Sequence, residues 1–509
     1  MKCAGVALGI LAVLMSAGPA PGAGRNQTAQ GFGALEKQVR EFSLPNGIRF
    51  IVLERHDVPI FSFRTYVNAG DADAVTGITG IAHMFEHMAF KGTPHVGTSD
   101  WTSEEPAIRT IDRAYAALMQ ERHKRRMADS TRLAELSKAL KAAQEDADRY
   151  VVSNEFSKVV EREGATDLNA FTGTDFTQYL YDLPSNKLEL WALMEGDRLA
   201  YPVLREFYKE RDVVIEERRE RYESSPSGRL FEDFLLTAFV AHPYGNGLIG
   251  HRSDLESFSR EQAQRFYEQH YVAKNMVVVV VGDVSTPEVE RLAGKYFSGV
   301  SDAPVPPPVD TVEPPQRGER RVVIEEDAQP FIFVGNHIPD VNDPRYHAYE
   351  ALADILGSGR SSRLYTRLVK EKKLAVNIGM EPGMPGEKYP NLMFTYVVPA
   401  SGVDPDSALA EMDASIARLL RDSPVTQEEL DGFKTRARAR FWRGIGSNQG
   451  MAGQLAYFQG MMGDWRRLFR QVDEINAVTA DDVMRAAREC LRKENRTVAI
   501  LRKSSGSSS

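Results

Sequence analysis

Residues 80–93 read Gly80-Ile-Ala-His-Met-Phe-Glu-His-Met-Ala-Phe-Lys-Gly-Thr93, and this stretch decides how the rest of the chain is interpreted. On a helix, His83 and His87 stand one turn apart on the same face, so their two imidazoles can hold one metal ion. Glu86 is near that face and close enough to reach a water on the metal. Two histidines and a carboxylate from elsewhere make an open three-ligand zinc site. A bare H-x-x-E-H also occurs on amphipathic helices with solvated or core histidines, so the surroundings have to decide.

The segments around the motif favour an active-site scaffold. Residues 61–70 alternate apolar and polar side chains, which is typical of a half-buried strand. The glycine-containing residues 70–80 then interrupt that strand before the helix begins. The sequence therefore predicts a strand, a loop and a metal-bearing helix in succession.

The third ligand is expected from a second helix within residues 206–219. There, Glu210 and Glu217 are two helical turns apart and share one face, whereas Glu216 is rotated by about 100° and points elsewhere. The alternative is a charged surface helix, which is common in a chain that is 26% charged. Taken alone, this segment does not choose between the two.

Three ordered motifs together resemble the pitrilysin (insulinase, M16) zinc peptidases, and within them the bacterial, processing-peptidase-like branch. They are His83-Met-Phe-Glu86-His87, then Leu168-Asn-Ala-Phe-Thr172, then Glu210-Arg-Asp-Val-Val-Ile-Glu-Glu217. The similarity runs from about residue 39 to residue 502. It implies an α+β protein of two related α/β domains, each an antiparallel sheet with helices on one face, facing each other across a chamber.

Carried over position by position, the resemblance implies a role for each site residue. His83, His87 and Glu217 would bind one Zn²⁺ per chain, Glu86 would be the general base, and Glu210 would support a ligand from behind. Asn169 and Ala170 would lie on a strand edge that receives the substrate backbone. A peptide added as a strand is read through its backbone, so we expect broad specificity for unfolded peptides.

One departure from the family pattern concerns the second half. Active single-chain members carry an Arg and a Tyr seven residues apart that bind substrate and stabilise the oxyanion, but the matching positions here are Val369 and Val376. A valine side chain donates no hydrogen bond. We therefore expect a heterodimer in which a homologous subunit supplies the Arg/Tyr pair. A non-catalytic scaffold or binding subunit is the alternative, and a homodimer that uses other donors is a weaker third option.

The chain divides at a Pro-rich stretch, and its halves look related. Residues 255–262 and 475–482 align without gaps at an offset of 220, and in each half a helix capped by Ser259 or Thr479 leads into an apolar strand. The sequence predicts five parts: a signal peptide at 1–24, a zinc-binding domain at 32–300, a linker at 301–318, a second M16-like domain at 319–503 and a disordered tail at 504–509.

A second departure is an insertion between the ligands. His83 and Glu217 are 134 residues apart, about fifty more than is usual in the family. Helical spacing of apolar residues across 101–155, with a break and cap at Asp129 and Ser130, predicts a charged helical hairpin. Its basic run, residues 122–126, is either a contact site for an anionic partner or a solvated helix face, and the pattern alone favours the solvated face.

Charge and composition exclude several classes of protein. The net charge of −8 argues against general nucleic-acid binding. Residues 1–24 have the short apolar core and small-residue end of a secretory signal, and no later stretch is apolar enough for a membrane span. Once Cys3 leaves with the signal, Cys490 stands alone and no intrachain disulfide is possible. We therefore expect a periplasmic or secreted bacterial protein.

Overall fold

The computed structural model describes residues 33–504. The expected signal peptide at 1–24 and nearly all of the expected tail at 504–509 lie outside this part of the chain. Among the described helices, none combines the length and apolar character that crossing a membrane requires.

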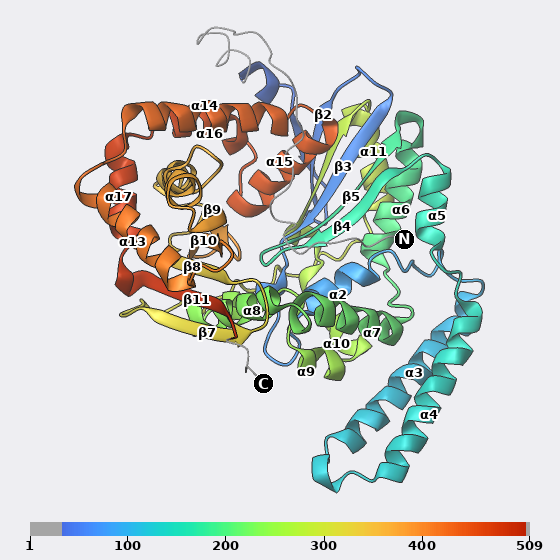
Figure 1. Cartoon of the computed structure of the whole chain (residues 1–509). Coiled ribbons are helices and arrows are strands. Elements are labelled where there is room, and N and C mark those ends of the chain that lie inside the picture. Colours follow the sequence, from blue (N-terminus) through green and yellow to red (C-terminus); the bar gives the residue numbers. More distant parts are fainter. Residues whose placement is uncertain (1–32, 505–509) are drawn as a thin grey trace.

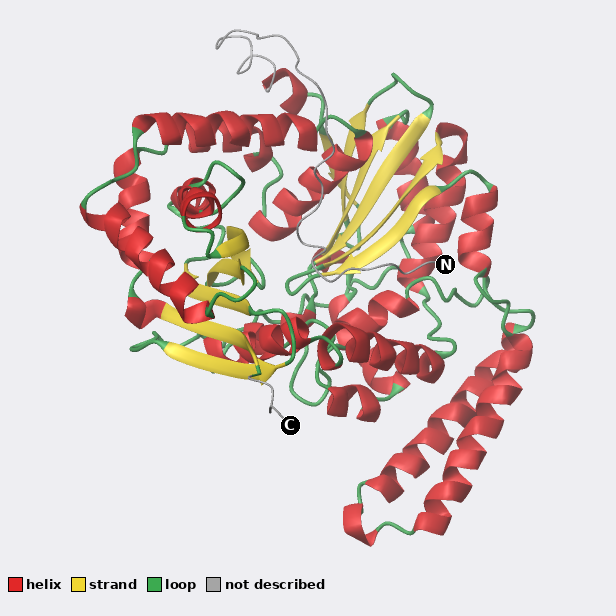
Figure 2. Ribbon diagram, viewed as in Figure 1, coloured by secondary structure: helices red, strands yellow, loops and turns green. Residues whose placement is uncertain are grey.

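Two mixed sheets form the framework of the molecule (Figures 1 and 2). The first has the order β1-β2-β6-β3-β5-β4, and the second has the order β7-β11-β8-β10-β9. The strands of the first are β1 (Arg40–Ser43), β2 (Arg49–Glu54), β3 (Ile60–Val67), β4 (Thr166–Thr172), β5 (Thr177–Pro184) and β6 (Met276–Gly282). Those of the second are β7 (Arg320–Glu326), β8 (Phe331–Ile338), β9 (Ala375–Met384), β10 (Asn391–Pro399) and β11 (Arg496–Lys503).

The two sheets repeat one plan. Apart from β1, each strand of the first sheet has a counterpart at the same place in the second, so that β6 corresponds to β11 and β4 to β9. All pairs are antiparallel except β2 with β6 and β7 with β11. The strands β6 and β11 each follow a helix that begins with a capping box, at Ser259 and at Thr479. The expected fold class, two related α/β units with mainly antiparallel sheets, is confirmed.

Helices cover the sheets. Those of the first half are α2 (Ile81–Met88), α3 (Trp101–Arg122), α4 (Ser130–Ala147), α5 (Glu155–Arg162), α6 (Leu188–Ala200), α7 (Phe207–Arg218), α8 (Pro226–Ala238), α9 (Arg252–Ser257), α10 (Arg260–His270) and α11 (Thr286–Tyr296). Those of the second half are α12 (Tyr346–Leu356), α13 (Pro405–Arg421), α14 (Gln427–Gly444), α15 (Asn448–Met462), α16 (Arg467–Ala477) and α17 (Ala480–Cys490). Residues 301–317, between the halves, contain neither helix nor strand.

One helix of each half packs on the sheet of the other half. Helix α8 packs on β7 and β11, and α15 packs on β3 and β6. The buried apolar face of α8 (Leu230, Phe234 and Leu235) joins a core with Phe333 and Phe394 of the second sheet. In return, α15 joins the core on the opposite face of the first sheet, so that this sheet has helices on both faces and not on one face, as the resemblance implied. Because these contacts bury large apolar side chains, the exchange locks the halves together.

Helices α3 and α4 form an antiparallel pair that projects from the body of the molecule (Figure 1). Asp129 caps α4 by accepting hydrogen bonds from the backbone N–H groups of Thr131 and Arg132. Leu118, Leu136 and Leu140 are buried between the two helices. The pair therefore has a small apolar core of its own.

Candidate metal centre

Helix α2 is positioned by the glycine that precedes it. Gly80 has a left-handed φ of 84°, and a Cβ there would lie 2.0 Å from the carbonyl oxygen of Ile249. Only glycine combines this conformation with so close an approach. Its N–H donates to the buried Asp71 carboxyl, 2.8 Å away. On the far side of α2, Phe85 packs against Tyr271 with ring centroids 4.5 Å apart. This packing turns His83 and His87 toward α7.

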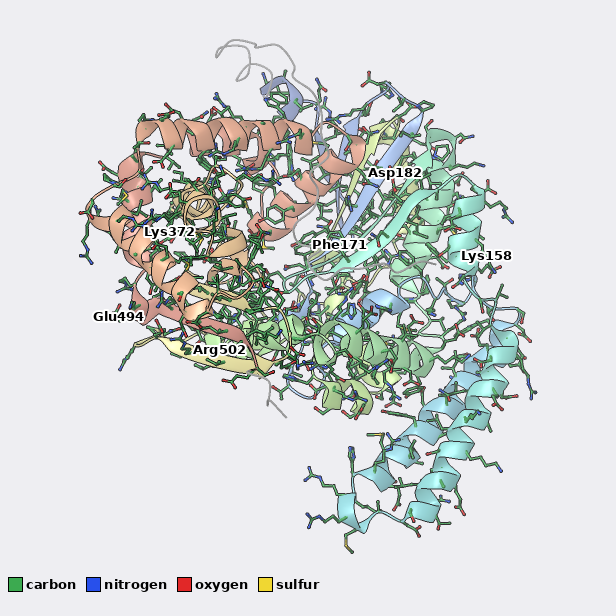
Figure 3. The ribbon with its side chains drawn as sticks, viewed as in Figure 1. Lys158, Phe171, Asp182, Lys372, Glu494 and Arg502 are labelled. Carbon is green, nitrogen blue, oxygen red and sulfur yellow. The ribbon has the colours of Figure 1, made fainter. Side chains whose placement is uncertain are left out.

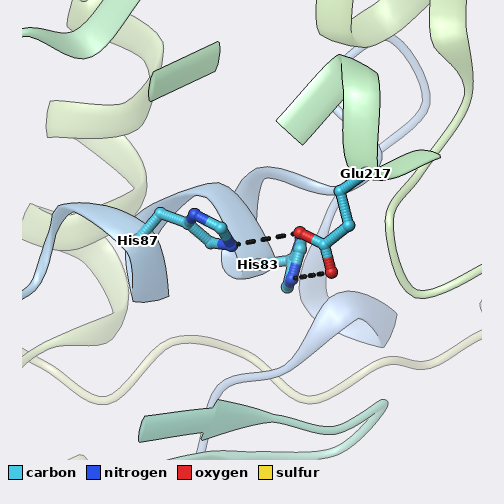
Figure 4. A group of neighbouring side chains, drawn as sticks. All are labelled: His83, His87 and Glu217. Atoms are coloured by element: carbon cyan, nitrogen blue, oxygen red, sulfur yellow. Dashed lines mark ion pairs between the residues drawn. The ribbon is translucent and has the colours of Figure 1, made fainter. Parts of the chain in front are cut away.

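The two histidines meet Glu217 of α7 (Figure 4). The Nε2 atom of His83 lies 3.8 Å from one oxygen of Glu217, and Nε2 of His87 lies 3.4 Å from the other. One ligand atom from each of the three side chains lies within 4.8 Å of those of the other two. In the described part of the chain, no other group of three His, Cys, Asp or Glu side chains meets this criterion.

Glu210 approaches His87 from behind. Its carboxylate lies 3.2 Å from Nδ1 of His87, the ring nitrogen that faces away from Glu217, and Lys91 pairs with the other carboxylate oxygen at 2.7 Å. Glu216 instead pairs with Arg219 at the surface. Glu210 and Glu217 thus share the face of α7 that the sequence predicted, and a carboxylate on Nδ1 fixes the orientation of a ring whose Nε2 is a ligand.

Arg221 is a neighbour of the centre that the sequence reasoning missed. It lies on the π-helical turn Arg219–Glu223 that continues α7, and its Nη2 is 2.7 Å from Glu217. The signal was present, because an arginine four residues after a glutamate on a helix faces it. π-Helical turns are frequent at functional sites.

The protonation of the cluster follows from its surroundings. Burial lowers the pKa of His83 to about 3, so its imidazole is neutral. Burial opposes ionisation of Glu217, but the hydrogen bond from His87 and the charge of Arg221 outweigh it and lower the pKa to about 2. For His87, burial is outweighed by the carboxylates of Glu210 and Glu217, which raise the pKa to about 9. One neutral imidazole, one anionic carboxylate and a second imidazole beside it make a donor set that fits Zn²⁺.

Glu86 lies between the cluster and the end of β4. Burial raises the pKa of its carboxyl, while hydrogen bonds from Thr172 and the charge of His87 oppose the rise. Thr172 is the last residue of β4. The structure therefore brings Glu86 to the same corner as the three clustered side chains and the edge strand.

Strand β4 is the outer strand of its sheet. Asn169 pairs with Leu180 and Ala170 with Tyr179 on β5, and within the described residues no strand pairs with the other side of β4. Asn169 and Phe171 are exposed, and Phe171 is labelled on this strand in Figure 3. The backbone N–H of Ala170 donates to Oδ1 of the neighbouring Asn169, 2.9 Å away. An outer strand is the kind of edge to which an extended peptide can add.

The two valines of the second half lie on and beside the matching outer strand. Val376 is on β9 and 58% exposed, whereas Val369 is half-buried on the π-helical turn Tyr365–Glu371. The neighbouring arginines are engaged elsewhere: Arg363 pairs with Glu429 and Arg367 with Glu411. Neither valine position offers a hydrogen-bond donor from its side chain.

Comparison with known proteins agrees with this architecture. The family model described as the Peptidase M16 inactive domain matches residues 257–436. The zinc protease PqqE of Helicobacter pylori is 26% identical over 474 residues, which cover 90% of this chain and 92% of that protein.

Solved structures extend the likeness to the fold. The crystal structure of a protease from Helicobacter pylori superposes with a TM-score of 0.75 at 25% identity, covering 91% of this chain and 99% of the other. The periplasmic protease PqqL from Escherichia coli superposes with a TM-score of 0.66 at 16% identity, covering 91% of this chain but 47% of PqqL. The PqqL chain is thus about twice as long as the unit it shares with this chain.

Proposed function

Because the chain belongs to the M16 family of peptidases, we propose that it is the zinc-bearing subunit of an endopeptidase that cleaves unfolded peptides. The observation that carries the proposal is the convergence of His83, His87 and Glu217 beside Glu86 at the free edge of β4. Relatives described as zinc proteases support the metal and the reaction class.

His83, His87 and Glu217 would hold the zinc, with Glu210 orienting the His87 ring through Nδ1. Zinc bound there supplies Lewis-acid chemistry, since it makes water more acidic and polarises a peptide carbonyl. Glu86 accepts a proton from the attacking water at its carboxylate and delivers it to the nitrogen of the leaving amine. Its raised pKa suits both steps, because a base that must later act as an acid works best near the pH of the reaction.

The substrate would add to β4 as a further strand. Its backbone would pair with the free edge at Asn169 and Ala170, which brings a peptide bond to the corner where β4 ends at Thr172 beside Glu86. Recognition through backbone hydrogen bonds accounts for broad specificity.

A partner subunit would complete the site. Losing one oxyanion donor typically lowers the rate by about 10²–10³-fold, and Val369 and Val376 leave both family donors missing. The proposed partner is a homologue of similar size that carries the Arg/Tyr pair. The PqqL chain, about twice the length of the shared unit, supports pairing of two such units. Residues 1–24 support a periplasmic or secreted location.

The experiment is cleavage of a quenched, unstructured peptide by the purified chain alone and mixed with the homologous partner, with Glu86→Gln as control. We expect cleavage only in the mixture and none with the variant. Full activity of the chain alone would refute the need for a partner. Zinc binding without cleavage under either condition would favour the second candidate, a non-catalytic scaffold of peptidase fold, which the two valines and the match to an inactive-domain model support.

A further inference from the structure

The free end of the α3–α4 hairpin carries a concentration of positive charge that the proposed reaction does not use. Residues 122–127 read Arg122-His-Lys-Arg-Arg-Met127, and all six are exposed. Four of them are cationic, whereas the whole chain has a net charge of −8. We call these six residues the hairpin tip. They project away from the metal centre, and nitrogen-ended side chains fan out from the end of the hairpin in Figure 3.

The charges of the tip are largely uncompensated. Within the described chain, Arg122, Arg125 and Arg126 form no ion pair. The two nearby acids are already engaged: Glu121 is buried, pairs with Lys124 and accepts from the backbone of Asp129, and Asp129 caps α4. On a solvated helix face, acidic and basic residues usually alternate and pair. The rest of the hairpin, which we call its shaft, follows this pattern, since Arg109 pairs with Glu105. The tip does not.

The tip also exposes an apolar side chain among its cations. Met127 is 84% exposed, more than any other large apolar residue in the described part of the chain. Long cationic side chains around an apolar residue form a surface that can insert at the boundary between lipid headgroups and acyl chains while the charges stay at the headgroups.

The hairpin is built to hold this tip at a distance. At its base, Arg205 forms a fully buried ion pair with Glu104 at 2.7 Å, and near the middle of α3 Arg260 pairs with Asp112. About two-thirds of the way along α3, the hydroxyl of Tyr115 donates toward the carbonyl of Ser257, 3.1 Å away. Beyond Tyr115, Leu118, Leu136 and Leu140 join the two helices. The α3–α4 hairpin is therefore fixed to the body of the molecule, and its tip can contact a flat surface.

From these observations we propose that the hairpin tip docks the protein on an anionic lipid surface. A stable protein interface needs about 800 Å² and 20–30 residues on each side, more than six residues at a turn provide. An anionic membrane instead attracts each basic residue separately, and each Lys or Arg near the surface raises the binding affinity by roughly fivefold. The number and crowding of cations at the tip suit the second kind of partner.

The test uses the full chain and sedimentation with vesicles of phosphatidylglycerol and phosphatidylcholine, mixed 1:1, or of phosphatidylcholine alone. We expect binding to the anionic vesicles only, and its loss at high salt because screening shortens the reach of the charges to about 3 Å at 1 M. Neutralising the three tip arginines together should lower binding by about 100-fold. The tip variant is Arg122→Gln, Arg125→Gln and Arg126→Gln.

A matched control removes the same charge from the shaft and base of the hairpin. It consists of Arg109→Gln, Arg113→Gln and Arg149→Gln, and it should leave binding within a fewfold of the unchanged chain. Met127→Ala should weaken binding less than the tip variant does, since one apolar contact is lost and all cations remain. Thermal melting shows that each variant is folded.

Three results would overturn the proposal: no binding to anionic vesicles at low salt, equal binding to phosphatidylcholine, or equal losses in the tip and shaft variants. Tip-dependent binding of polyglutamate without vesicle binding would also overturn it, in favour of an acidic protein partner.

Discussion

The two halves of the molecule share a strand order and a helix plan, yet within the described residues only the first gathers three side chains that could hold a metal ion. Helices α7 and α14 occupy corresponding places in the two halves and can be compared residue by residue. Both begin after an N-cap, Glu206 and Thr426, at the offset of 220 that relates the halves. At that offset Glu210 stands opposite Leu430 and Glu217 opposite Ala437, and both apolar residues are buried in the second core.

The helix that faces α14 is different in the same way. Helix α12 buries Ala348, Ala351 and Leu352. Its two acids are both engaged: Asp354 is bound by Arg436 and Arg440 of α14, and Glu350 pairs with His347 of its own helix. The scaffold therefore places two helices face to face in both halves, and the residues on the facing sides decide whether an apolar core or a polar cluster forms between them. In the second half, apolar side chains and closed ion pairs form a core, whereas in the first half two histidines and a carboxylate face one another near a free strand edge.

The largest expected effect comes from giving α7 the residue that α14 carries. Glu217→Ala removes the only carboxylate among the three clustered donors and leaves two imidazoles, which are too few for an open three-ligand zinc site. We expect loss of both zinc and peptide cleavage, measured as metal content after gel filtration and as turnover in the presence of the proposed partner subunit. Glu216→Ala, at the exposed neighbouring position, is the control and should change neither. Retained stoichiometric zinc would show that another side chain serves as the third ligand.

The next effect separates chemistry from metal binding. Glu86→Gln keeps the shape of the side chain but removes the base, so turnover should fall by about 10²–10⁴-fold while zinc content stays at one per chain. The comparison is of turnover and metal content in the same samples. A loss of zinc equal to the loss of activity would instead make Glu86 part of the metal-binding set.

A smaller effect is expected at Glu210, the position of α7 that corresponds to Leu430 of α14. Glu210→Gln weakens the contact that orients His87 through Nδ1, and it should reduce zinc affinity by about 10–100-fold. Competition with a chelator of known affinity measures the change. Unchanged affinity would mean that the packing of α2 alone fixes the His87 ring.

Much of the site could be predicted from the sequence because its geometry is local. The spacing of His83, Glu86 and His87 within one helix, and of Glu210 and Glu217 within another, fixes which side chains share a face. The family resemblance also supplied the edge strand at Asn169 and Ala170, which the structure places outermost in its sheet.

The exchange of α8 and α15 could not be predicted in the same way. The spacing of Leu230, Phe234 and Leu235 shows that α8 has a buried face, but that pattern is the same whichever sheet covers it. The choice depends on contacts between residues far apart in the sequence, such as Phe234 with Phe394. The pairing of Asp354 with Arg436 could not be predicted for the same reason, since each residue alone is typical of a charged surface position.

The smallest expected effect concerns a buried carboxylate of the second half that has structural partners instead of a metal centre. Glu387 accepts hydrogen bonds from Tyr346 and Tyr457, and its backbone N–H donates to Asp175 of the first half. Burial raises the pKa of its side chain to about 7. The folded chain therefore holds a proton that the unfolded chain releases near pH 4.5, so this residue makes the protein less stable as the pH rises from about 4.5 to 7.

Glu387→Gln should remove that pH dependence, because the amide stays neutral in both states. Each unit of pKa shift corresponds to about 1.4 kcal/mol in the free energy of unfolding, so the variant should gain stability relative to the unchanged chain at pH 8 but not at pH 4.5. Urea unfolding at the two pH values measures the difference, with the exposed Glu325→Gln as control. Since other acids also titrate in this range, the informative quantity is the difference between the two chains. A difference that does not change with pH would mean that the pKa of Glu387 is the same in the folded and the unfolded chain, so that burial beside Tyr346 and Tyr457 does not keep this carboxyl protonated.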